Sequence, residues 1–390
     1  MAMSINEVLE KCEKYVIKRN YKSYDLFDAL TNSFIDRITK NKQLLRRIAI
    51  QVVSKSPMDL HWLGMKKMLH TKTISDLLWF YSIEKGTEAA NEINYFFELL
   101  IQNKSNKGYG WGLNFPYATR FIDADAQMPN LYNTANSAIS ICHSFYYLND
   151  KNKVIAKDAL GGVVEFMEKE LGYVDENEKG WYIYYPGQKY PTYNVNALAI
   201  YLIVFIKKLD VGNPDFLDKR IRALINLLHG EQEANGSWYY SRSSKGKWVD
   251  GFHTGFVLES LAFAYKEGYQ NELTEMLQKG WTFYLNEMFA DDGYPKYFLQ
   301  SNKYPIEAQN YAQTIQTLAN VCTWLNWDQK ELLNKVIKIA VDNLFDERGF
   351  FYYKKTKYLT YKKPYLRWAV TPMMLALSYA KQYIGEQIKA

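Results

Sequence analysis

A phrase that recurs five times along the chain constrains its fold more than any other feature. The phrase is a glycine, an aromatic residue, a tyrosine-rich run typical of a hairpin, polar residues and then a helix-forming stretch. The five copies begin at Gly110, Gly180, Gly236, Gly293 and Gly349. The last four are spaced about 56 residues apart, and a fixed period indicates a repeat architecture. Since this length holds two antiparallel helices and their loops, the phrase predicts stacked helical hairpins.

Two kinds of predicted helix alternate between these glycines. An apolar helix follows each phrase, at 133–148, 194–209, 254–265, 311–325 and 369–383. An amphipathic helix then leads to the next phrase, at 152–171, 219–234, 271–290 and 329–345. A helix that is apolar all round is buried, whereas an amphipathic helix has one face in solvent. The alternation therefore predicts an inner ring and an outer ring of helices.

Residues 1–100 lack a clear copy of the phrase but have helical patterns at 6–18, 44–53, 73–82 and 88–102. Residues 56–64 fit a degenerate loop of the same series, because terminal repeats are usually atypical. This region and the five clear hairpins of 101–390 make about six. We expect an all-α, (α/α)6 toroid in a single domain, 1–390. An open solenoid is the alternative, and the closed ring is favoured because the length matches one turn of six.

Composition excludes several classes of protein. The N-terminal residues do not form a signal peptide, and no apolar run is long enough to span a bilayer, so a cytoplasmic protein without a transmembrane segment is expected. Three distant cysteines give neither a disulfide framework nor a metal site. A net charge of +6 is small and dispersed, and does not imply nucleic acid. The 33 Tyr and 10 Trp suit a partly wet sugar cleft, although they could equally cap helix ends in the core.

The richest candidate site precedes the predicted helix at 254–265. Asp250 and His253 lie three residues apart there. His titrates near neutral pH, and a carboxylate can orient or stabilise it as a general base. The alternative is structural, because Asp is also a favoured residue for capping a helix N-terminus.

Three other loops carry candidate chemistry. Arg120 could hold a carboxylate or phosphate by two-point contact; Asp123 and Asp125, just after it, resemble the paired aspartates of protonating terpene cyclases but lack the usual third acidic residue. Glu307 is a candidate acid or base, or an acidic residue that complements a helix dipole. Arg367 lies in a basic, aromatic loop that suits an anionic sugar chain. The residues that we expect to contact the sugar are Trp111, Asn114, Tyr117, Arg120, Asn194, Asn196, Trp238, Tyr297, Arg367 and Trp368.

Several of these phrases resemble a known family over most of the chain, from about Tyr24 to Leu377. The matching stretches are 111–117, 250–256, 294–297, 304–307 and 367–368. The family consists of α/α-toroid proteins from bacterial and archaeal cell-surface polysaccharide gene clusters. More broadly, the chain is similar to the six-hairpin carbohydrate enzymes, which include uronate lyases, glucuronyl epimerases, sugar 2-epimerases and unsaturated glucuronyl hydrolases. It is more distantly similar to terpenoid cyclases.

The chain departs from this pattern at two places. The resemblance implies a His in the loop after Ile306, where this sequence has Ala308-Gln309-Asn310. It also implies a Gln after Trp368, where this sequence has Ala369. If those positions are catalytic in relatives, this member has a changed specificity or is inactive.

These observations lead to one preferred function and three alternatives. We expect an enzyme that epimerises or cleaves an anionic, uronate-type glycan by proton abstraction, without a metal or nucleotide cofactor. His253 or a loop Tyr would be the base, Asp250 would orient His253, and Arg120 and Arg367 would neutralise the substrate carboxylate. The alternatives are a glycoside hydrolase that pairs Asp250 with Glu307, a non-catalytic glycan-binding or scaffold protein, and a terpenoid-cyclase-like enzyme.

Overall fold

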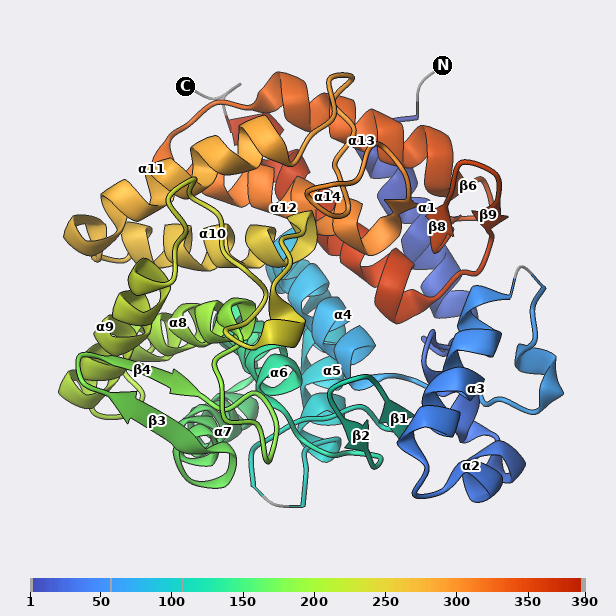
Figure 1. Cartoon of the computed structure of the whole chain (residues 1–390), viewed down its shortest axis with the longest axis horizontal. Helices are drawn as coiled ribbons and strands as arrows, with labels where there is room; N and C mark the ends of the chain where they lie inside the picture. Colours follow the sequence, from blue (N-terminus) through green and yellow to red (C-terminus); the bar gives the residue numbers. More distant parts are fainter. Residues whose placement is uncertain (1–2, 57, 107, 387–390) are drawn as a thin grey trace.

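Six inner helices form a closed ring. The computed structural model describes residues 3–56, 58–106 and 108–386. The inner helices are α4 (Thr71–Glu84), α6 (Leu131–Ser144), α8 (Tyr193–Lys208), α10 (Gly251–Lys266), α12 (Ala308–Leu325) and α14 (Thr371–Glu386). Each packs against the next, and α14 packs against α4 (Figure 1). The predicted all-α toroid is therefore confirmed, and the open solenoid is excluded.

The outer helices cover this ring with one face each. They are α1 (Ile5–Lys18), α5 (Ala90–Gln102), α7 (Asp150–Phe166), α9 (Pro214–Gly230), α11 (Gln270–Glu287) and α13 (Lys330–Leu344). In α9, for example, Leu217, Ile221, Leu224 and Leu228 are buried at a helical spacing, while the opposite face is polar. The inner helix α8 instead has every residue from Tyr193 to Ile206 buried. The predicted division into apolar inner and amphipathic outer helices is thus observed.

Two of the repeated glycines allow their loops to approach the backbone of an outer helix closely. Gly236 and Gly349 both have φ of +92°, a conformation that side chains rarely adopt. A Cβ at Gly236 would lie 2.4 Å from the carbonyl oxygen of Lys279 in α11. A Cβ at Gly349 would lie 2.2 Å from the carbonyl oxygen of Lys11 in α1. The last repeat therefore packs on the first helix, which makes α1 the sixth outer helix.

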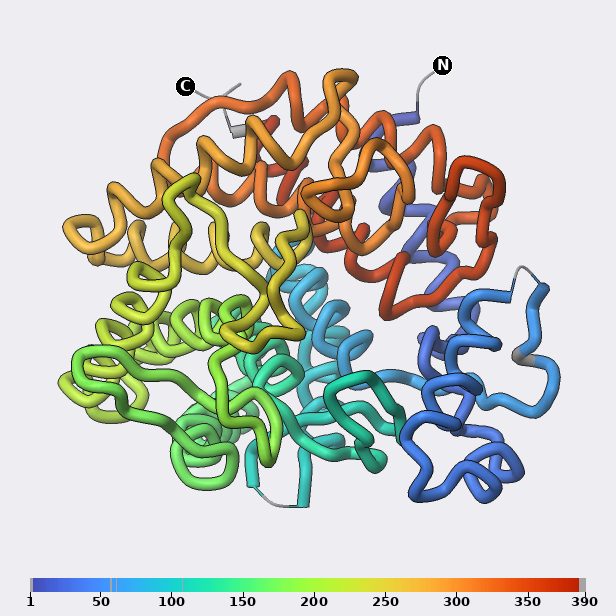
Figure 2. Tube along the Cα trace, viewed as in Figure 1, coloured from blue at the N-terminus to red at the C-terminus, as the bar shows by residue number. Residues whose placement is uncertain are grey.

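An additional unit lies in the loop between α1 and α4, where this outer helix leads to the first inner helix. This unit contains the short helices η1 (Asp28–Thr31) and η2 (His61–Leu63) and the helices α2 (Ser33–Thr39) and α3 (Gln43–Lys55). It has a small core of its own, formed by Ala29, Leu30, Ile50, Val53 and Met65 with Ala118. Figures 1 and 2 show it beside the ring. Residues 56 and 58–64 of the predicted degenerate loop lie between an outer and an inner helix, as the repeat loops do, and residue 57 lies outside the described residues.

Short antiparallel strands connect the loops between helices. They are β1 (Tyr117–Ala118) with β2 (Asp123–Ala124), β3 (Tyr173–Glu176) with β4 (Lys179–Tyr182), and β6 (Phe345–Asp346) with β7 (Phe350–Phe351). A three-stranded sheet has the order β5 (Ile306–Glu307), β8 (Lys354–Lys355) and β9 (Thr360–Tyr361). In it, Glu307 lies opposite Lys354. This register fixes a candidate acid next to a cation.

Candidate active site

Asp250 holds His253 through both of its carboxylate oxygens. Asp250 is the N-cap of α10, and its Oδ1 accepts a hydrogen bond from the His253 backbone N–H at 2.7 Å. Its Oδ2 accepts from His253 Nδ1 at 2.6 Å and from Trp248 Nε1 at 2.9 Å. The structural and functional interpretations of Asp250 are therefore compatible, because one carboxylate caps the helix and orients the imidazole.

This contact leaves His253 suited to accept a proton. The side chain of Asp250 is 5% exposed and that of His253 is 28% exposed. Burial alone would raise the pKa of Asp250, but the nearby His253 and the hydrogen bonds from His253 and Trp248 hold it below its usual value. An ionised Asp250 keeps the proton of the neutral imidazole on Nδ1, so Nε2 carries the lone pair.

His253 lines a surface cavity of about 370 Å³, which we call the His253 cavity. Its lining is Arg120, Trp248, Asp250, Phe252, His253, Tyr297 and Phe298. The exposed Arg120 guanidinium lies 4.4 Å from the centroid of the Trp248 ring. The Trp248 ring also stacks on the ring of Tyr240, with 4.5 Å between the two centroids. A base, a cation and aromatic surfaces thus share one wall, which suits an anionic sugar.

Two loops meet at this cavity through backbone contacts. Gly251 N–H donates to the Tyr297 carbonyl at 3.1 Å, and Asp250 forms an antiparallel bridge with Phe298. Leu299 N–H donates to the Val249 carbonyl at 3.1 Å. The segment before α10 and the segment after α11 therefore hold His253 and Tyr297 in a fixed relation.

Glu307 lies behind Tyr297 and is only 4% exposed. Burial raises the pKa of Glu307 to about 7, in spite of the opposing effects of Lys354 and of a hydrogen bond with Tyr297. The charge of Asp250 adds to the increase, so the two carboxyls influence each other. The charge of Glu307, followed by burial, raises the pKa of the Tyr297 phenol well above its usual value. Tyr297 therefore keeps its proton.

A second cavity on the ring axis was not anticipated from the sequence. Residues of all six inner helices line it, and Phe252 borders both this cavity and the His253 cavity. Lys72 pairs with Asp76 at 2.6 Å, and Asp76 accepts a further hydrogen bond from Thr371 at 2.8 Å. A charged i,i+4 pair inside the apolar helix α4 was the available signal.

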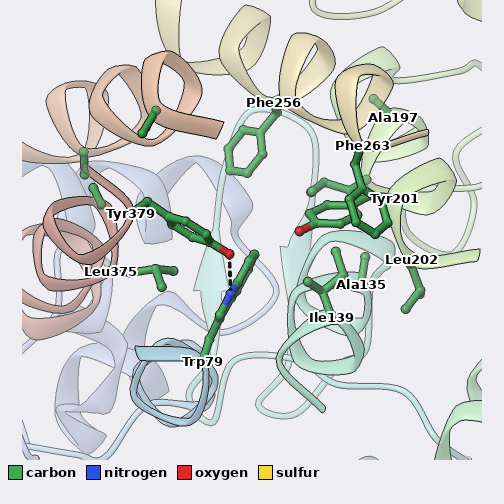
Figure 3. Packing of buried hydrophobic residues seen from close by; sticks show 14 of the residues in the cluster. Trp79, Ala135, Ile139, Ala197, Tyr201, Leu202, Phe256, Phe263, Leu375 and Tyr379 are labelled. Carbon is green, nitrogen blue, oxygen red and sulfur yellow. Dashed lines mark hydrogen bonds between the residues drawn. The ribbon is translucent and has the colours of Figure 1, made fainter. Parts of the chain in front are cut away.

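Amides and aromatic rings complete this axial cavity. Glu259 accepts hydrogen bonds from Gln313, Gln316 and Asn320 at 2.7–2.8 Å. Burial raises the pKa of Glu259 above its usual value, although these amides oppose the shift. Figure 3 shows Trp79 and Tyr379 from two inner helices joined by a hydrogen bond, which measures 2.8 Å. The lining thus contains buried charged and amide groups, unlike the closed apolar cavity that a terpene cyclase requires.

Trp111 and Trp238 do not occupy the positions expected of them. Both rings are buried in the core, and each indole N–H donates to a backbone carbonyl of an outer helix, Leu100 O at 2.8 Å and Leu228 O at 2.9 Å. Trp111 lines none of the cavities described here, and Trp238 borders only a small cavity that it shares with Asn194 and His253. Trp248, which the sequence did not single out as a sugar contact, lies on the cavity wall instead.

The predicted asparagine contacts are divided between structure and site. Asn196 is buried and clamps the β4 strand through the backbone N–H and carbonyl of Tyr182, so it is structural. Asn114 bonds His70 and the Leu69 carbonyl. Asn194 lines a small cavity together with His253, and its buried Oδ1 lacks a partner among the described residues. Asn194 is therefore the asparagine best placed to reach a ligand.

Arg367 and Trp368 belong to a separate cluster. The Arg367 guanidinium forms two hydrogen bonds with the buried carboxylate of Asp25, at 2.6 and 2.7 Å. Trp368 donates to the same carboxylate at 3.3 Å, and its ring packs edge-on against Phe27. Tyr117 stacks on Phe27 as well. Since Arg367 is buried with a bidentate partner, it is not available to neutralise a substrate carboxylate as expected.

Asp123 and Asp125 do not form a paired acid. Asp123 is paired with Arg46 of α3, and Asp125 is exposed in the loop that follows β2. Neither residue lines the axial cavity. At the two departures from the family pattern, Gln309 lines the axial cavity and Ala369 is buried in the core.

Two general properties complete the description of the site. Within residues 3–56, 58–106 and 108–386, no group of three or more His, Cys, Asp or Glu side chains is arranged to hold a metal ion. None of the helices in this described part has the length and apolarity needed to cross a bilayer.

Comparison with solved structures relates the fold to enzymes. A sugar epimerase from a ruminal bacterium matches with a TM-score of 0.64 and 15% identity, over 83% of this chain and 90% of that one. An unsaturated glucuronyl hydrolase specific for heparin matches with a TM-score of 0.58 and 12% identity, over 82% and 86%. A polysaccharide lyase matches with a TM-score of 0.56 and 12% identity, over 97% of both chains.

Sequence comparison adds no closer relative. No family model and no curated protein matches this sequence. At 12–15% identity, the structural matches concern the arrangement of the helices. The chain has the α/α-toroid fold that is also found in sugar epimerases, unsaturated glucuronyl hydrolases and polysaccharide lyases.

Proposed function

We propose that this protein is a carbohydrate-active enzyme that abstracts a proton from a uronate-type glycan and thereby epimerises or cleaves it. One observation carries the proposal. The Asp250–His253 pair opens onto a cavity whose wall also contains Arg120. This chemistry needs at least a base and a nearby cation. Here the base is an imidazole whose Nδ1 is held by a carboxylate, and the cation lies in the same cavity.

In this mechanism His253 Nε2 removes the proton on the carbon next to the substrate carboxylate. The electron pair of the broken C–H bond moves into the carboxylate, and Arg120 stabilises the charge that develops there. For epimerisation, a proton returns to the opposite face of the same carbon. For elimination, a C=C bond forms and the glycosidic oxygen leaves with a proton. Tyr297 would supply this proton in either case, because its phenol lines the same cavity.

The structural neighbours support this substrate class without fixing it. The matched proteins are described as a sugar epimerase, a heparin-specific unsaturated glucuronyl hydrolase and a polysaccharide lyase. All three descriptions concern sugars, and that of the hydrolase concerns a glucuronyl group. The position of Arg120 favours an anionic sugar over a neutral one.

A glycoside hydrolase is the second candidate, and a specific observation favours it. The pKa of Glu307 is raised to about 7 while that of Asp250 is lowered, and such a separation often marks an acid and a base. Against it, Asp250 already accepts three hydrogen bonds and Glu307 lies behind Tyr297. Both carboxyls would have to be uncovered before they could act directly on a sugar.

The test is turnover of a panel of uronate-containing oligosaccharides. Deuterium uptake from heavy water without cleavage indicates an epimerase, a new unsaturated uronate indicates a lyase, and new reducing ends alone indicate a hydrolase. His253→Ala must lose the signal, whereas His229→Ala, which removes an exposed histidine of α9, must keep it. Saturable binding without turnover would support a glycan-binding protein instead.

A further inference from the structure

Helix α3 has apolar side chains on two opposite faces. Ile50 and Val53 are buried against the small core of the N-terminal unit. On the other side Leu44, Ile48 and Val52, spaced four residues apart, are 63%, 49% and 57% exposed. A helix at the edge of a protein normally has polar residues on its solvent side. The exposed stripe of α3 therefore needs a partner that the toroid does not supply.

The exposed apolar surface continues on neighbouring elements. Asn32 Nδ2 donates to the Leu63 carbonyl at 2.7 Å, which holds η2 beside the start of α2. Trp62 of η2 is 72% exposed, and Phe34 of α2 is 59% exposed. We call this surface the apolar face; it consists of Phe34, Ile38, Leu44, Leu45, Ile48, Val52, Met58, Trp62 and Leu63. Single exposed apolar residues are ordinary, but a cluster of this kind marks an interaction site.

The positive charge of the chain is concentrated in the same segment. Residues 33–67 contain eight Lys and Arg, of the 48 in the chain, and two Asp, of the 42 acidic residues. The rest of the protein therefore has 40 residues of each sign, and the whole net charge of +6 lies in this segment. This finding corrects the expectation that the charge is dispersed. The exposed basic residues are Arg37, Lys40, Lys42, Lys55, Lys66 and Lys67.

We propose that α2, α3 and η2 dock on the surface of an anionic lipid membrane. The apolar face would enter the boundary between headgroups and acyl chains, and the surrounding lysines and arginines would contact lipid phosphates. Amphipathic helices that lie in the membrane interface combine Trp, Phe and Leu with a Lys- and Arg-rich border in this way. A protein partner fits less well, because lysine is depleted in protein–protein interfaces.

The docking surface is connected to the candidate active site. Gln43 Nε2 of α3 donates to the Thr119 carbonyl at 2.9 Å, and Arg46 of α3 pairs with Asp123. These contacts hold both sides of the turn that joins β1 to β2, which carries Arg120 and lies next to α3 in Figure 1. Membrane docking would therefore fix the Arg120 loop close to the lipid surface, whatever reaction the site catalyses.

Vesicle co-sedimentation of the full chain tests the proposal. We expect binding to vesicles that contain phosphatidylglycerol, weaker binding as salt increases, and little binding to phosphatidylcholine alone. The double variant Ile48→Ser/Trp62→Ser should weaken binding to the anionic vesicles roughly tenfold or more, because two inserted apolar side chains are lost. Lys40→Glu/Lys42→Glu should weaken it through charge. These side chains are exposed, so the variants should keep the wild-type melting temperature.

Matched variants elsewhere on the surface separate docking from general effects. Tyr146→Ser/Val154→Ser removes two apolar side chains that are at least as exposed as Ile48, and Lys151→Glu/Lys157→Glu reverses two exposed charges. Both should bind vesicles like the wild type. Absence of binding to anionic vesicles, or equal loss in the control pairs, would overturn the proposal. A different result would overturn it as well: a wild-type protein that is a dimer in size-exclusion chromatography and does not bind vesicles, with Ile48→Ser/Trp62→Ser a monomer.

Discussion

The carboxylate of Asp25 and the guanidinium of Arg367 form a buried bidentate ion pair between residues 342 positions apart. Asp25 lies in the segment after α1, and Arg367 lies just before α14, so the pair joins the two ends of the ring. Burial by itself would raise the pKa of Asp25, but Arg367 lowers it to about 2. Arg367 is therefore part of the structure that closes the toroid.

Removing Arg367 should destabilise the fold more than it affects a ligand. Arg367→Leu leaves the Asp25 carboxylate buried without its cation, and such a loss costs about 3–5 kcal/mol. Urea unfolding at neutral pH measures this change. Arg348→Leu is the control, because Arg348 pairs with Asp346 at the exposed surface and should change stability much less. If Arg367→Leu has the stability of the wild type but binds glycan more weakly, Arg367 is a ligand-binding residue and this assignment is wrong.

Glu307 should make stability depend on pH in the direction opposite to Asp25. Its pKa is 4.5 in the unfolded chain and about 7 when folded. The folded state therefore holds the proton more tightly, so its contribution is complete below pH 4.5 and is lost as the pH rises through 7. The loss amounts to about 3 kcal/mol. Urea unfolding of wild type and Glu307→Gln across this range should show a smaller slope for the variant, and equal slopes would contradict the shift.

Asp250→Asn should separate the two roles of Asp250. Asn is also a good N-cap, so α10 and the melting temperature should change little. The amide cannot hold the Nδ1 proton as a carboxylate does, and turnover should fall roughly a thousandfold or more. Calorimetry and the uronate assay measure the two effects on one preparation. A variant that keeps full turnover would show that the reaction does not need the Asp250 carboxylate to orient His253.

Two tryptophans near α10 should respond differently to truncation. Trp238→Ala empties a core position and should cost about 3–5 kcal/mol of stability. Trp248→Ala removes a half-buried ring from the cavity wall and should cost less stability but weaken glycan binding. Thermal unfolding measures the stability of each variant, and titration with an oligosaccharide that the wild type binds measures its affinity. If Trp238→Ala lost glycan binding at normal stability while Trp248→Ala kept it, Trp238 would be the sugar contact and this assignment would be wrong.

The repeat made the ring predictable because each copy carries its own local signal. The glycine at Gly236 and the apolar run of α8 follow from backbone and burial rules that act over a few residues. The unit around α2 and α3 was not predictable as a separate body, because its helices have ordinary patterns and its core depends on contacts with Ala118.

The candidate site was predictable only where partners are close in sequence. Asp250 and His253 are three residues apart at a helix start, so their contact could be expected. Arg367 looked free because its partner is at the other end of the chain. A buried Trp238 and a cavity-lining Trp248 look alike in sequence, since aromatic residues serve cores and sugar surfaces equally.

The contact of Gly349 with Lys11 has a consequence for how the protein loses its structure. A linear array of repeats can fray from its two ends, because its terminal units have only one neighbour. Here α1 packs on the last repeat, and every hairpin has neighbours on both sides. Deleting α1 would uncover α14 and weaken this junction, leaving ring closure to the contact of α14 with α4. Unfolding that is a single cooperative event in the intact chain would then begin at this junction.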